Sequence, residues 1–296
     1  MRPNPSGSYF RHHIRQFPAS RSLPIMKRAD PLGSLRHLLA RANPFSDLTW
    51  ARHRATGLHY RVNARDVVGR HILRYQGYEH GLTAWLLERL AQAGGSALFV
   101  DIGANLGWYS LQAAHLAGVA RVVALEPDLR NHTLLRANVE RNGMGDKVDA
   151  LALAAGPGPG LAMLHTYKSS NLGKHSLAVD HGQGGSWVGV ESLDTLLQRL
   201  GLEEGPIAAI KIDVEGFEPA VLEGASGALQ RCQALLVELS PELSRKGGLD
   251  LPGMIGAIRR SGLRPVIWDQ EGPVPDFAAI AACGKQITVG FERPRS

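Results

Sequence analysis

Two carboxylates and two glycines form the strongest chemical signal in this sequence. Asp101 is followed by Gly103 and Gly107, and Glu126 ends the run Arg121-Val-Val-Ala-Leu-Glu126. Glycine lets the backbone turn tightly and approach a ligand closely, and an acid after the second strand of a nucleotide-binding fold hydrogen-bonds ribose hydroxyls. The spacing differs from the dinucleotide fingerprint G-x-G-x-x-G, and the Asp101 carboxylate would repel a pyrophosphate. The pair therefore suits a ligand with a ribose, a positive charge and no phosphate, such as S-adenosylmethionine.

A second group of candidate residues lies further along the chain. The apolar run Ile207–Ile212 predicts a buried strand, and Asp213 and Glu215 follow it. Acids at the end of a central strand again indicate the ligand edge of a sheet. A carboxylate at such an edge can act as a general base that takes up a proton, and both acids are candidates for this role. His175, in the irregular polar stretch 165–187, is a third candidate because its usual pKa suits proton transfer near neutral pH, although a loop histidine is more often simply solvated.

Apolar periodicity predicts the elements that must position these groups. The run 98–100 predicts a strand, the glycine turn follows it, and residues 108–117 have helical spacing. Asp128 is a suitable N-cap for a helix over 129–142. Lys211 interrupts its apolar strand, and we expect its ammonium group to reach a sheet edge. Further strands are expected at 58–62, 121–126, 147–152, 161–165, 233–239, 264–269 and 286–292, and further helices at 82–93, 193–200, 219–229 and 251–261.

The N-terminal part differs from the rest in charge. Residues 1–45 contain eight Lys or Arg residues and one acid, a net charge of +7, so the other 251 residues sum to −1. We expect disorder there, apart from a short helix near 32–41. A transit peptide and attraction to an anionic membrane surface are alternatives, and Met26 is a second candidate start. We expect residues 46–97 to form a lid or brace, and residues 98–296 to form the cofactor-binding domain.

Composition narrows the class of protein. The 296 residues are 44% hydrophobic, which suffices for one large α/β domain or two small ones. Nucleic-acid binders carry their positive charge on the domain that reads the ligand, so we expect no nucleic-acid partner. No apolar run approaches the ~18 residues of a membrane span. Cys232 and Cys283 match no metal or disulfide spacing, which favours a reducing, cytoplasmic setting.

Three motifs together resemble the FkbM family of S-adenosylmethionine-dependent methyltransferases. They are Val100-Asp-Ile-Gly-Ala-Asn-Leu-Gly107, Leu125-Glu-Pro127 and Ile210-Lys-Ile-Asp-Val-Glu-Gly216, and the last is the most specific. The stretches Gly77-Tyr-Glu79 and Asn171-Leu-Gly-Lys-His-Ser-Leu177 are also similar to that family. The resemblance covers roughly residues 58–291 and leaves the basic N-terminal part unexplained.

The resemblance implies a fold, a cofactor and a reaction. The fold is α/β, the Rossmann-like class I methyltransferase fold: a seven-stranded, mostly parallel sheet in the order 3-2-1-4-5-7-6, with the last strand antiparallel and helices on both faces. The cofactor is S-adenosylmethionine, and the reaction is O-methylation of a hydroxyl on a sugar, glycan, polyketide or related metabolite. Asp213 and Glu215 would face the reaction centre. The implied cofactor-binding residues are Asp101, Gly103, Ala104, Asn105, Gly107, Glu126 and Pro127, and the implied substrate-binding residues are Glu79, Asn171 and Ser176.

Three other functions stay open. A metal-dependent O-methyltransferase needs a cluster of oxygen ligands, of which Asp213 and Glu238 could supply part, although we assign no metal ligand. A nicotinamide-dependent oxidoreductase would share the fold but lacks the fingerprint. A binding module without activity would keep the fold alone. We expect a small-molecule or glycan acceptor that the sequence does not identify, and a homodimer is left open.

Overall fold

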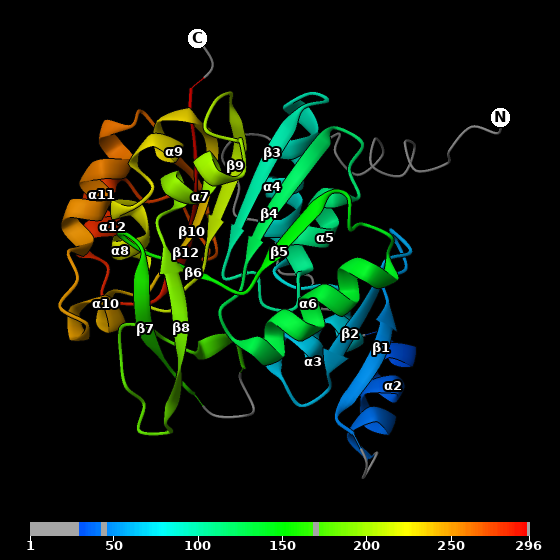
Figure 1. The fold of residues 1–296 in the computed structure, drawn as a ribbon. Coiled ribbons are helices and arrows are strands. Elements are labelled where there is room, and N and C mark those ends of the chain that lie inside the picture. Colours follow the sequence, from blue (N-terminus) through cyan, green and yellow to red (C-terminus); the bar gives the residue numbers. More distant parts are fainter. Residues whose placement is uncertain (1–29, 43–45, 168–171, 295–296) are drawn as a thin grey trace.

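The centre of the molecule is a seven-stranded sheet, seen in a computed structural model that describes residues 30–42, 46–167 and 172–294 (Figure 1). Its strands lie in the order β11-β12-β10-β9-β3-β4-β5, which is 3-2-1-4-5-7-6 from β5 to β11 when the seven are numbered in chain order. β12 is antiparallel to both of its neighbours, and the remaining pairs are parallel. The predicted fold class is therefore confirmed. The strands are β3 (Ala97–Ile102), β4 (Val119–Leu125), β5 (Val148–Leu151), β9 (Ile207–Ile212), β10 (Cys232–Leu239), β11 (Arg264–Trp268) and β12 (Ile287–Glu292).

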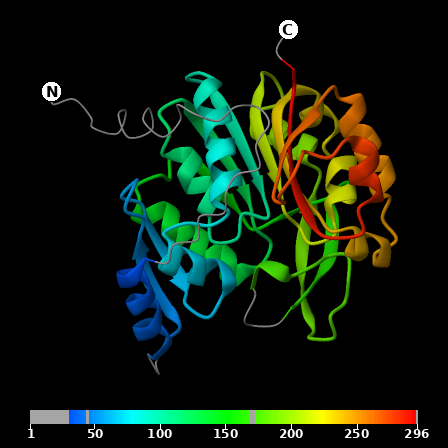
Figure 2. The ribbon, with the colours of Figure 1, turned by 180° about the vertical axis from the view of Figure 1, so that it is seen from behind.

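Helices cover both faces of this sheet, so its central strands are buried throughout (Figures 1 and 2). Every residue of β3 and β9 is buried, as the continuous apolar runs of a parallel sheet predict. Side chains alternate between the faces, so Phe99 packs on one side and Leu98 and Val100 on the other. The Phe99 face packs on α3 (Val67–Tyr75), α4 (His80–Gln92), α5 (Trp108–Ala114) and α6 (Leu129–Arg141). The Leu98 face packs on α7 (Leu193–Arg199), α8 (Glu218–Glu223), α9 (Ser226–Arg231), α11 (Leu251–Arg260) and α12 (Phe277–Ala282).

Two small sheets extend the molecule beyond the carboxyl ends of β3 and β4 (Figure 1). One is the antiparallel hairpin of β1 (Leu48–Arg52) and β2 (His59–Asn63). The other joins β6 (Ala154–Ala155), β8 (Gly185–Glu191) and β7 (Gly160–His165). The short 3-10 helix η1 (Leu172–Lys174) follows β7, and α10 (Pro241–Lys246) follows β10. Both sheets therefore lie at the end of the main sheet where an α/β fold binds its ligands.

The structure confirms one of the predicted helices and corrects another. Residues 31–42 form α2 (Pro31–Ala42), which confirms the short helix expected near 32–41. Residues 1–29 lie outside the described residues. The single helix expected over 219–229 is two helices, α8 and α9, because the chain bends at Gly224, where an added Cβ would lie 2.0 Å from the Gly156 carbonyl oxygen. No helix in the described part of the chain is long and apolar enough to cross a membrane.

The β1–β2 hairpin is attached to the main domain by two asparagines of α6. Asn142 Oδ1 accepts from the His59 N–H (2.9 Å), and its Nδ2 donates to the His59 carbonyl (2.8 Å). Asn138 is fully buried; its Oδ1 accepts from the Arg61 N–H, and its Nδ2 donates to the Leu106 carbonyl at 2.8 Å. The two amides therefore bond to β2 as a neighbouring strand would, and Asn138 also fixes the end of the glycine turn.

We expect Asn138→Ala to lower the free energy of unfolding by about 2–4 kcal/mol, because it leaves buried backbone groups of Arg61 and Leu106 without a partner, at about 1–3 kcal/mol for each unmade bond. Urea unfolding measures the change. Glu140→Ala, on the exposed side of the same helix, is the control and should stay within about 0.5 kcal/mol of the parent protein. Equal effects of the two substitutions would show that the asparagine does not hold the hairpin.

Candidate functional site

The turn between β3 and α5 can be made only with glycine at its first position. Gly103 has a φ of 74°, and an added Cβ would lie 1.8 Å from the Asp213 carbonyl oxygen. The N–H groups of Gly103 and Ala104 both donate to the Leu125 carbonyl, at 3.0 and 2.9 Å. Gly107, with a φ of 90°, then begins α5 against Leu135. The ends of β3, β4 and β9 are therefore drawn together around this turn.

A buried lysine joins the two central strands at the same place. Asp101 and Lys211 are direct neighbours in the register of β3 and β9, and Asp213 follows two residues after Lys211 on the same side of the sheet. Lys211 Nζ lies 2.8 Å from the Gly103 carbonyl oxygen, 3.2 Å from Asp213 Oδ2 and 3.7 Å from Asp101 Oδ1. Burial alone would lower the pKa of Lys211, but the carboxylates of Asp213 and Asp101 raise it above its usual value. The lysine therefore stays charged, and its ammonium group lies at the carboxyl edge of the sheet, buried against these partners.

The first of two cavities lies over the ends of β3 and β4, and we call it the turn cavity. Its polar wall comes from Gly103, Asn105, Glu126 and Pro127, all of which were predicted as cofactor-binding residues. Its apolar wall comes largely from the stretch around β6 and β7, which is not among the predicted site residues. The main apolar lining residues are Leu125, Leu153, Ala154, Ala155, Leu164 and Leu177.

Glu126 is the buried acid of the turn cavity. Its Oε2 accepts from the Asn105 N–H at 2.7 Å and its Oε1 from the Asp128 N–H at 2.9 Å. Burial raises the pKa of Glu126 to about 7, although both backbone N–H groups oppose the shift. Each carboxylate oxygen can accept a second hydrogen bond. The side chain is thus held rigidly with acceptor capacity left for a hydroxyl-bearing ligand.

The second cavity, of about 320 Å³, lies over the ends of β3, β9 and β10, and we call it the acid cavity. Five carboxylates and two lysines line it, together with the aromatic rings of Tyr78, Trp108 and Tyr109. Tyr109 donates its hydroxyl to Glu79 Oε2 at 2.7 Å, and Trp108 donates to the Thr83 hydroxyl at 3.1 Å. The charged lining residues are Glu79, Asp213, Glu215, Glu238, Asp269, Lys174 and Lys211.

Crowding of these carboxylates alters their protonation. Burial, and then repulsion by Asp213, raises the pKa of both Glu79 and Glu215 to about 7. The same two causes raise the pKa of Glu238 well above its usual value. Carboxylate oxygens of Asp213, Glu215 and Glu238 lie within 4.8 Å of one another, and Lys174 Nζ lies 3.4 Å from Glu215 Oε1. The cavity therefore combines acids that can exchange protons near neutral pH with strong attraction for positive charge.

The two cavities meet at a shared wall. Gly103, Asn105, Gly173 and Asp213 line both of them. A ligand in the turn cavity and a second ligand in the acid cavity would therefore approach each other beside Asp213. The arrangement suits transfer of a group from one molecule to another.

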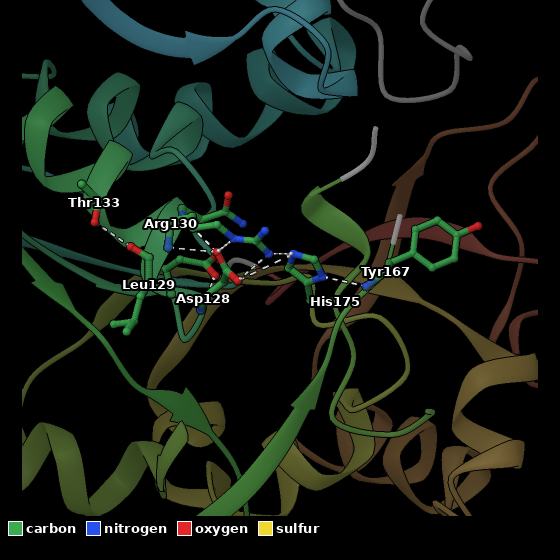
Figure 3. Close-up of polar contacts among 8 residues, drawn as sticks. Asp128, Leu129, Arg130, Thr133, Tyr167 and His175 are labelled. Atoms are coloured by element: carbon green, nitrogen blue, oxygen red, sulfur yellow. Dashed lines mark hydrogen bonds and ion pairs between the residues drawn. The ribbon is translucent and has the colours of Figure 1, made fainter. Parts of the chain in front are cut away.

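His175 lines the turn cavity and not the acid cavity. Its ring contacts Arg130 and Tyr167 (Figure 3). Its Nδ1 accepts from the Tyr167 N–H at 2.9 Å, so the neutral ring carries its proton on Nε2. Nε2 lies 3.2 Å from Arg130 Nη2 and 3.7 Å from Asp128 Oδ2. Burial lowers the pKa of His175; Asp128 raises it and Arg130 lowers it further. The ring therefore has no free acceptor atom facing the acid cavity.

The structure brings most predicted site residues together but not all. Asp101 is fully buried beneath the turn, where its Oδ2 accepts from the Ser110 hydroxyl at 2.6 Å, and it lines neither cavity. Ala104 lines the acid cavity, whereas Gly107 only starts α5. Ser176 is fully buried outside both cavities, and its hydroxyl donates to the Glu215 carbonyl at 2.7 Å. Asn171 lies outside the described residues.

Several lining residues had no signal of their own in the sequence. Tyr109 and Lys174 stand in ordinary helical or loop contexts, and only the fold brings them to the acid cavity. Lys211 did carry a signal, because a lysine inside an apolar strand must find a buried partner. The sequence did not indicate which carboxylates those partners are.

Comparison with known proteins gives the chain a family context. The model of the methyltransferase FkbM domain matches residues 101–265. Among proteins with curated descriptions, none matches significantly. The methyltransferase FkbM of Methylobacillus flagellatus KT has 19% identity and a TM-score of 0.42, and the match covers 67% of this chain but only 44% of that one.

Two further solved structures are similar at a comparable level. The O-methyltransferase of Bacillus cereus, in complex with SAH, has 15% identity and a TM-score of 0.40, with 90% of this chain and 93% of that chain covered. Trm5 of Methanocaldococcus jannaschii, in complex with adenosine, has 9% identity and a TM-score of 0.43, with 85% and 56% covered. None of these structural likenesses is strong enough to indicate an acceptor.

The raised pKa of Glu79 predicts a pH-dependent cost in stability. Its pKa rises from 4.5 to about 7 on folding. The contribution of this carboxyl to the free energy of unfolding is therefore most favourable at pH values below its pKa in the unfolded chain, and it is lost as the pH rises through about 7. We expect Glu79→Gln, which keeps an acceptor for Tyr109, to stabilise the protein by about 1–3 kcal/mol at pH values above the folded pKa and by little below 4.5. Urea unfolding across this range measures it, with the exposed Glu223→Gln as control. A gain that did not depend on pH would contradict the assignment.

Proposed function

Since this chain belongs to the FkbM methyltransferase family, we propose that it transfers the methyl group of S-adenosylmethionine to a hydroxyl group of a small molecule or glycan. The observation that carries the proposal is the meeting of the turn cavity and the acid cavity at Asp213. The turn cavity would hold the methyl donor, and the acid cavity would hold the acceptor.

The chemistry of the turn cavity fits the donor. Glu126 offers buried carboxylate oxygens with acceptor capacity for ribose hydroxyls. Leu153, Leu164 and Leu177 offer an apolar surface suited to an adenine ring. Asp213, at the shared wall, offers a negative charge that favours a sulfonium group over a phosphate. S-adenosylmethionine supplies an electrophilic methyl group, and the chain's own task is to align the acceptor with it.

We assign Glu215 as the base that takes up the proton of the acceptor hydroxyl. This carboxyl is buried, lines the acid cavity and not the turn cavity, and has its pKa raised to about 7, mainly by burial, which matches a base that works near neutral pH. Asp213 is paired at 3.2 Å with Lys211, which is buried, whereas Lys174, which lies 3.4 Å from Glu215, is 35% exposed. We therefore assign Asp213 a role in binding and orientation. Glu79, held by the Tyr109 hydroxyl, would bind the acceptor.

We assign His175 a positioning role at the turn cavity. Its contacts with Tyr167, Arg130 and Asp128 fix the ring against the start of α6. With Nδ1 occupied by a backbone N–H, the neutral ring cannot accept a proton there without losing that bond. The ring would shield the donor from water on one side.

Two alternative functions can each be separated from this proposal by a specific test. The grouping of Asp213, Glu215 and Glu238 could serve a divalent cation in a metal-dependent methyltransferase, and adding a chelator to the turnover assay separates this from the proposal. A nicotinamide-binding oxidoreductase would bind a dinucleotide in the turn cavity, and titration with that ligand in place of S-adenosylmethionine separates it. We also propose that the protein acts in the cytoplasm on a small-molecule or glycan acceptor. In this proposal the cofactor-binding domain extends over residues 98–296.

Replacing Glu126 tests the methyl donor site. Glu126→Gln keeps the size of the side chain but removes the charge and half of its acceptor capacity, and hydrogen bonds to a charged group contribute about 1.5–3 kcal/mol. We expect S-adenosylmethionine to bind about tenfold to a hundredfold more weakly by titration calorimetry. Glu218→Gln is the matched control, because Glu218 is also fully buried but lies outside both cavities. Equal affinity of Glu126→Gln and the parent protein would remove Glu126 from the donor site.

Replacing Glu215 tests the base. We expect Glu215→Gln to lower kcat by about 10²- to 10⁴-fold and to leave the affinity for S-adenosylmethionine unchanged, since Glu215 does not line the turn cavity. In the parent protein, activity should rise as the pH rises through about 7, where the carboxyl loses its proton, and the variant should lose this limb.

His175→Ala is the comparison for that experiment. It should weaken binding of the methyl donor and keep the pH dependence of the parent protein. The reverse pattern, with the limb lost in His175→Ala and kept in Glu215→Gln, would make the histidine the base.

A further inference from the structure

Helix α2 turns its small and polar side toward the protein. Gly33 and His37 are its buried residues, and Ala40 packs against the core. Gly33 approaches α3 so closely that an added Cβ would lie 2.1 Å from the Leu73 carbonyl oxygen. His37 Nε2 lies 3.0 Å from the Ala64 carbonyl oxygen. The rotation of the helix about its axis is therefore fixed by close contacts.

This rotation leaves the leucines of α2 in solvent. Four of them, each between 51% and 65% exposed, are the residues Leu32, Leu35, Leu38 and Leu39. At about 100° per residue they form one stripe along the helix, on the side opposite Gly33, His37 and Ala40, and we call it the leucine stripe. Amphipathic helices of globular proteins normally bury such a stripe. An exposed apolar row of this kind marks an interaction surface.

Arginines surround the leucine stripe. Arg36 and Arg41 are exposed and flank it on its two sides. Arg41 also lines a groove of about 1120 Å³ between α2, the β1–β2 hairpin and the start of α6. We call it the arginine groove, because among the described residues Asp47 is the only acid that lines it. The basic lining residues are His37, Arg41, Arg61, Arg65, Arg70 and Arg130.

Little of this positive charge is neutralised within the protein. Arg65 pairs with Asp47 and Arg130 with Asp128. In the described part of the chain, Arg41, Arg61 and Arg70 have no ion pair. The sequence that precedes α2 adds to the charge, since residues 1–29 contain six Lys or Arg residues and no acid. An anionic surface would therefore be attracted to this end of the molecule.

We propose that the leucine stripe and the arginine groove together dock the protein on a membrane surface rich in anionic lipid. An apolar helix face flanked by basic residues is the pattern of a helix that lies in the bilayer interface. Each Lys or Arg close to an anionic surface adds about 1 kcal/mol of attraction. The proposal concerns a peripheral contact and does not depend on the proposed catalytic function.

Other occupants use only part of this surface. A second copy of the chain, related by two-fold symmetry, would cover the leucines but bring like-charged arginines together. Residues 1–29 are themselves basic, so the arginine groove would repel them. A nucleic acid would pair with the arginines and leave the leucine stripe in water. Only an anionic bilayer satisfies the apolar and the charged parts at once.

The docked face would adjoin the candidate site. Arg130 and Leu129 line the arginine groove, and Arg130 Nη2 lies 3.2 Å from His175 Nε2 at the turn cavity (Figure 3). A membrane held against the arginine groove would therefore lie next to the rim of the turn cavity.

Vesicle flotation with the full chain tests the proposal. We expect binding to phosphatidylcholine vesicles that contain phosphatidylglycerol, loss of that binding as salt is added, and little binding to phosphatidylcholine alone. Leu35→Gln combined with Leu39→Gln should weaken binding about tenfold or more, because less apolar surface enters the interface. Leu161→Gln is the control, since Leu161 is more exposed than Leu35 or Leu39 but lies on β7, in a different sheet, and this variant should bind as the parent protein does.

Three results would overturn the proposal. The first is failure of the parent protein to bind phosphatidylglycerol vesicles at low salt. The second is unchanged binding by the Leu35 and Leu39 variant together with equal competition by heparin, which would indicate a site for soluble polyanions. The third is a dimer in light scattering that the leucine substitutions dissociate, which would assign the stripe to a second copy. The lipid and salt comparisons need only the parent protein, and thermal unfolding checks that each variant is folded.

Discussion

The candidate site depends on the buried ammonium group of Lys211. A charge inside a sheet is tolerated only when it is paired and hydrogen-bonded, and Lys211 meets Asp101, Asp213 and the Gly103 carbonyl oxygen. These partners come from the ends of β3 and β9, so the lysine holds the two strands' following turns against each other. Gly103 then lies so close to the Asp213 carbonyl oxygen that an added Cβ would be only 1.8 Å from it. The shape of the glycine turn and the position of Asp213 therefore depend on each other.

The same end of the sheet collects more negative charge than Lys174 and Lys211 can balance. Three residues that line the acid cavity, Glu79, Asn105 and Glu215, also have a positive φ, at 45°, 52° and 49°. Strained backbone and crowded carboxylates both cost stability, and they cluster at functional sites. In this protein they surround the wall shared by the two cavities. A cationic group bound there would relieve the repulsion, which is consistent with a sulfonium donor.

The candidate site and the surface that we propose for docking adjoin each other but are built from different elements. The turn cavity and the acid cavity lie where the strand order reverses, between β3 and its neighbours β4 and β9. The small sheet of β6, β7 and β8 supplies much of the apolar wall of the turn cavity, whereas α2 packs on α3. The start of α6 links the two regions, because Asp128 holds the N–H groups of Arg130 and Asn131 while Arg130 reaches both His175 and the arginine groove.

The sequence by itself determined the sheet and the identity of its ligand edge. Apolar runs gave the strands, Gly103 and Gly107 gave the turn, and acids after the runs marked the edge, because these signals are local and periodic. Tertiary structure alone decided which groups meet across that edge. It placed Lys211 between Asp101 and Asp213, separated His175 from the acid cavity, and buried Ser176 beneath Glu215. It also turned the leucines of α2 outward, since close packing at Gly33 and not hydrophobic periodicity sets the rotation of that helix. Contacts between residues far apart in sequence depend on strand order, register and close packing, which no local pattern encodes.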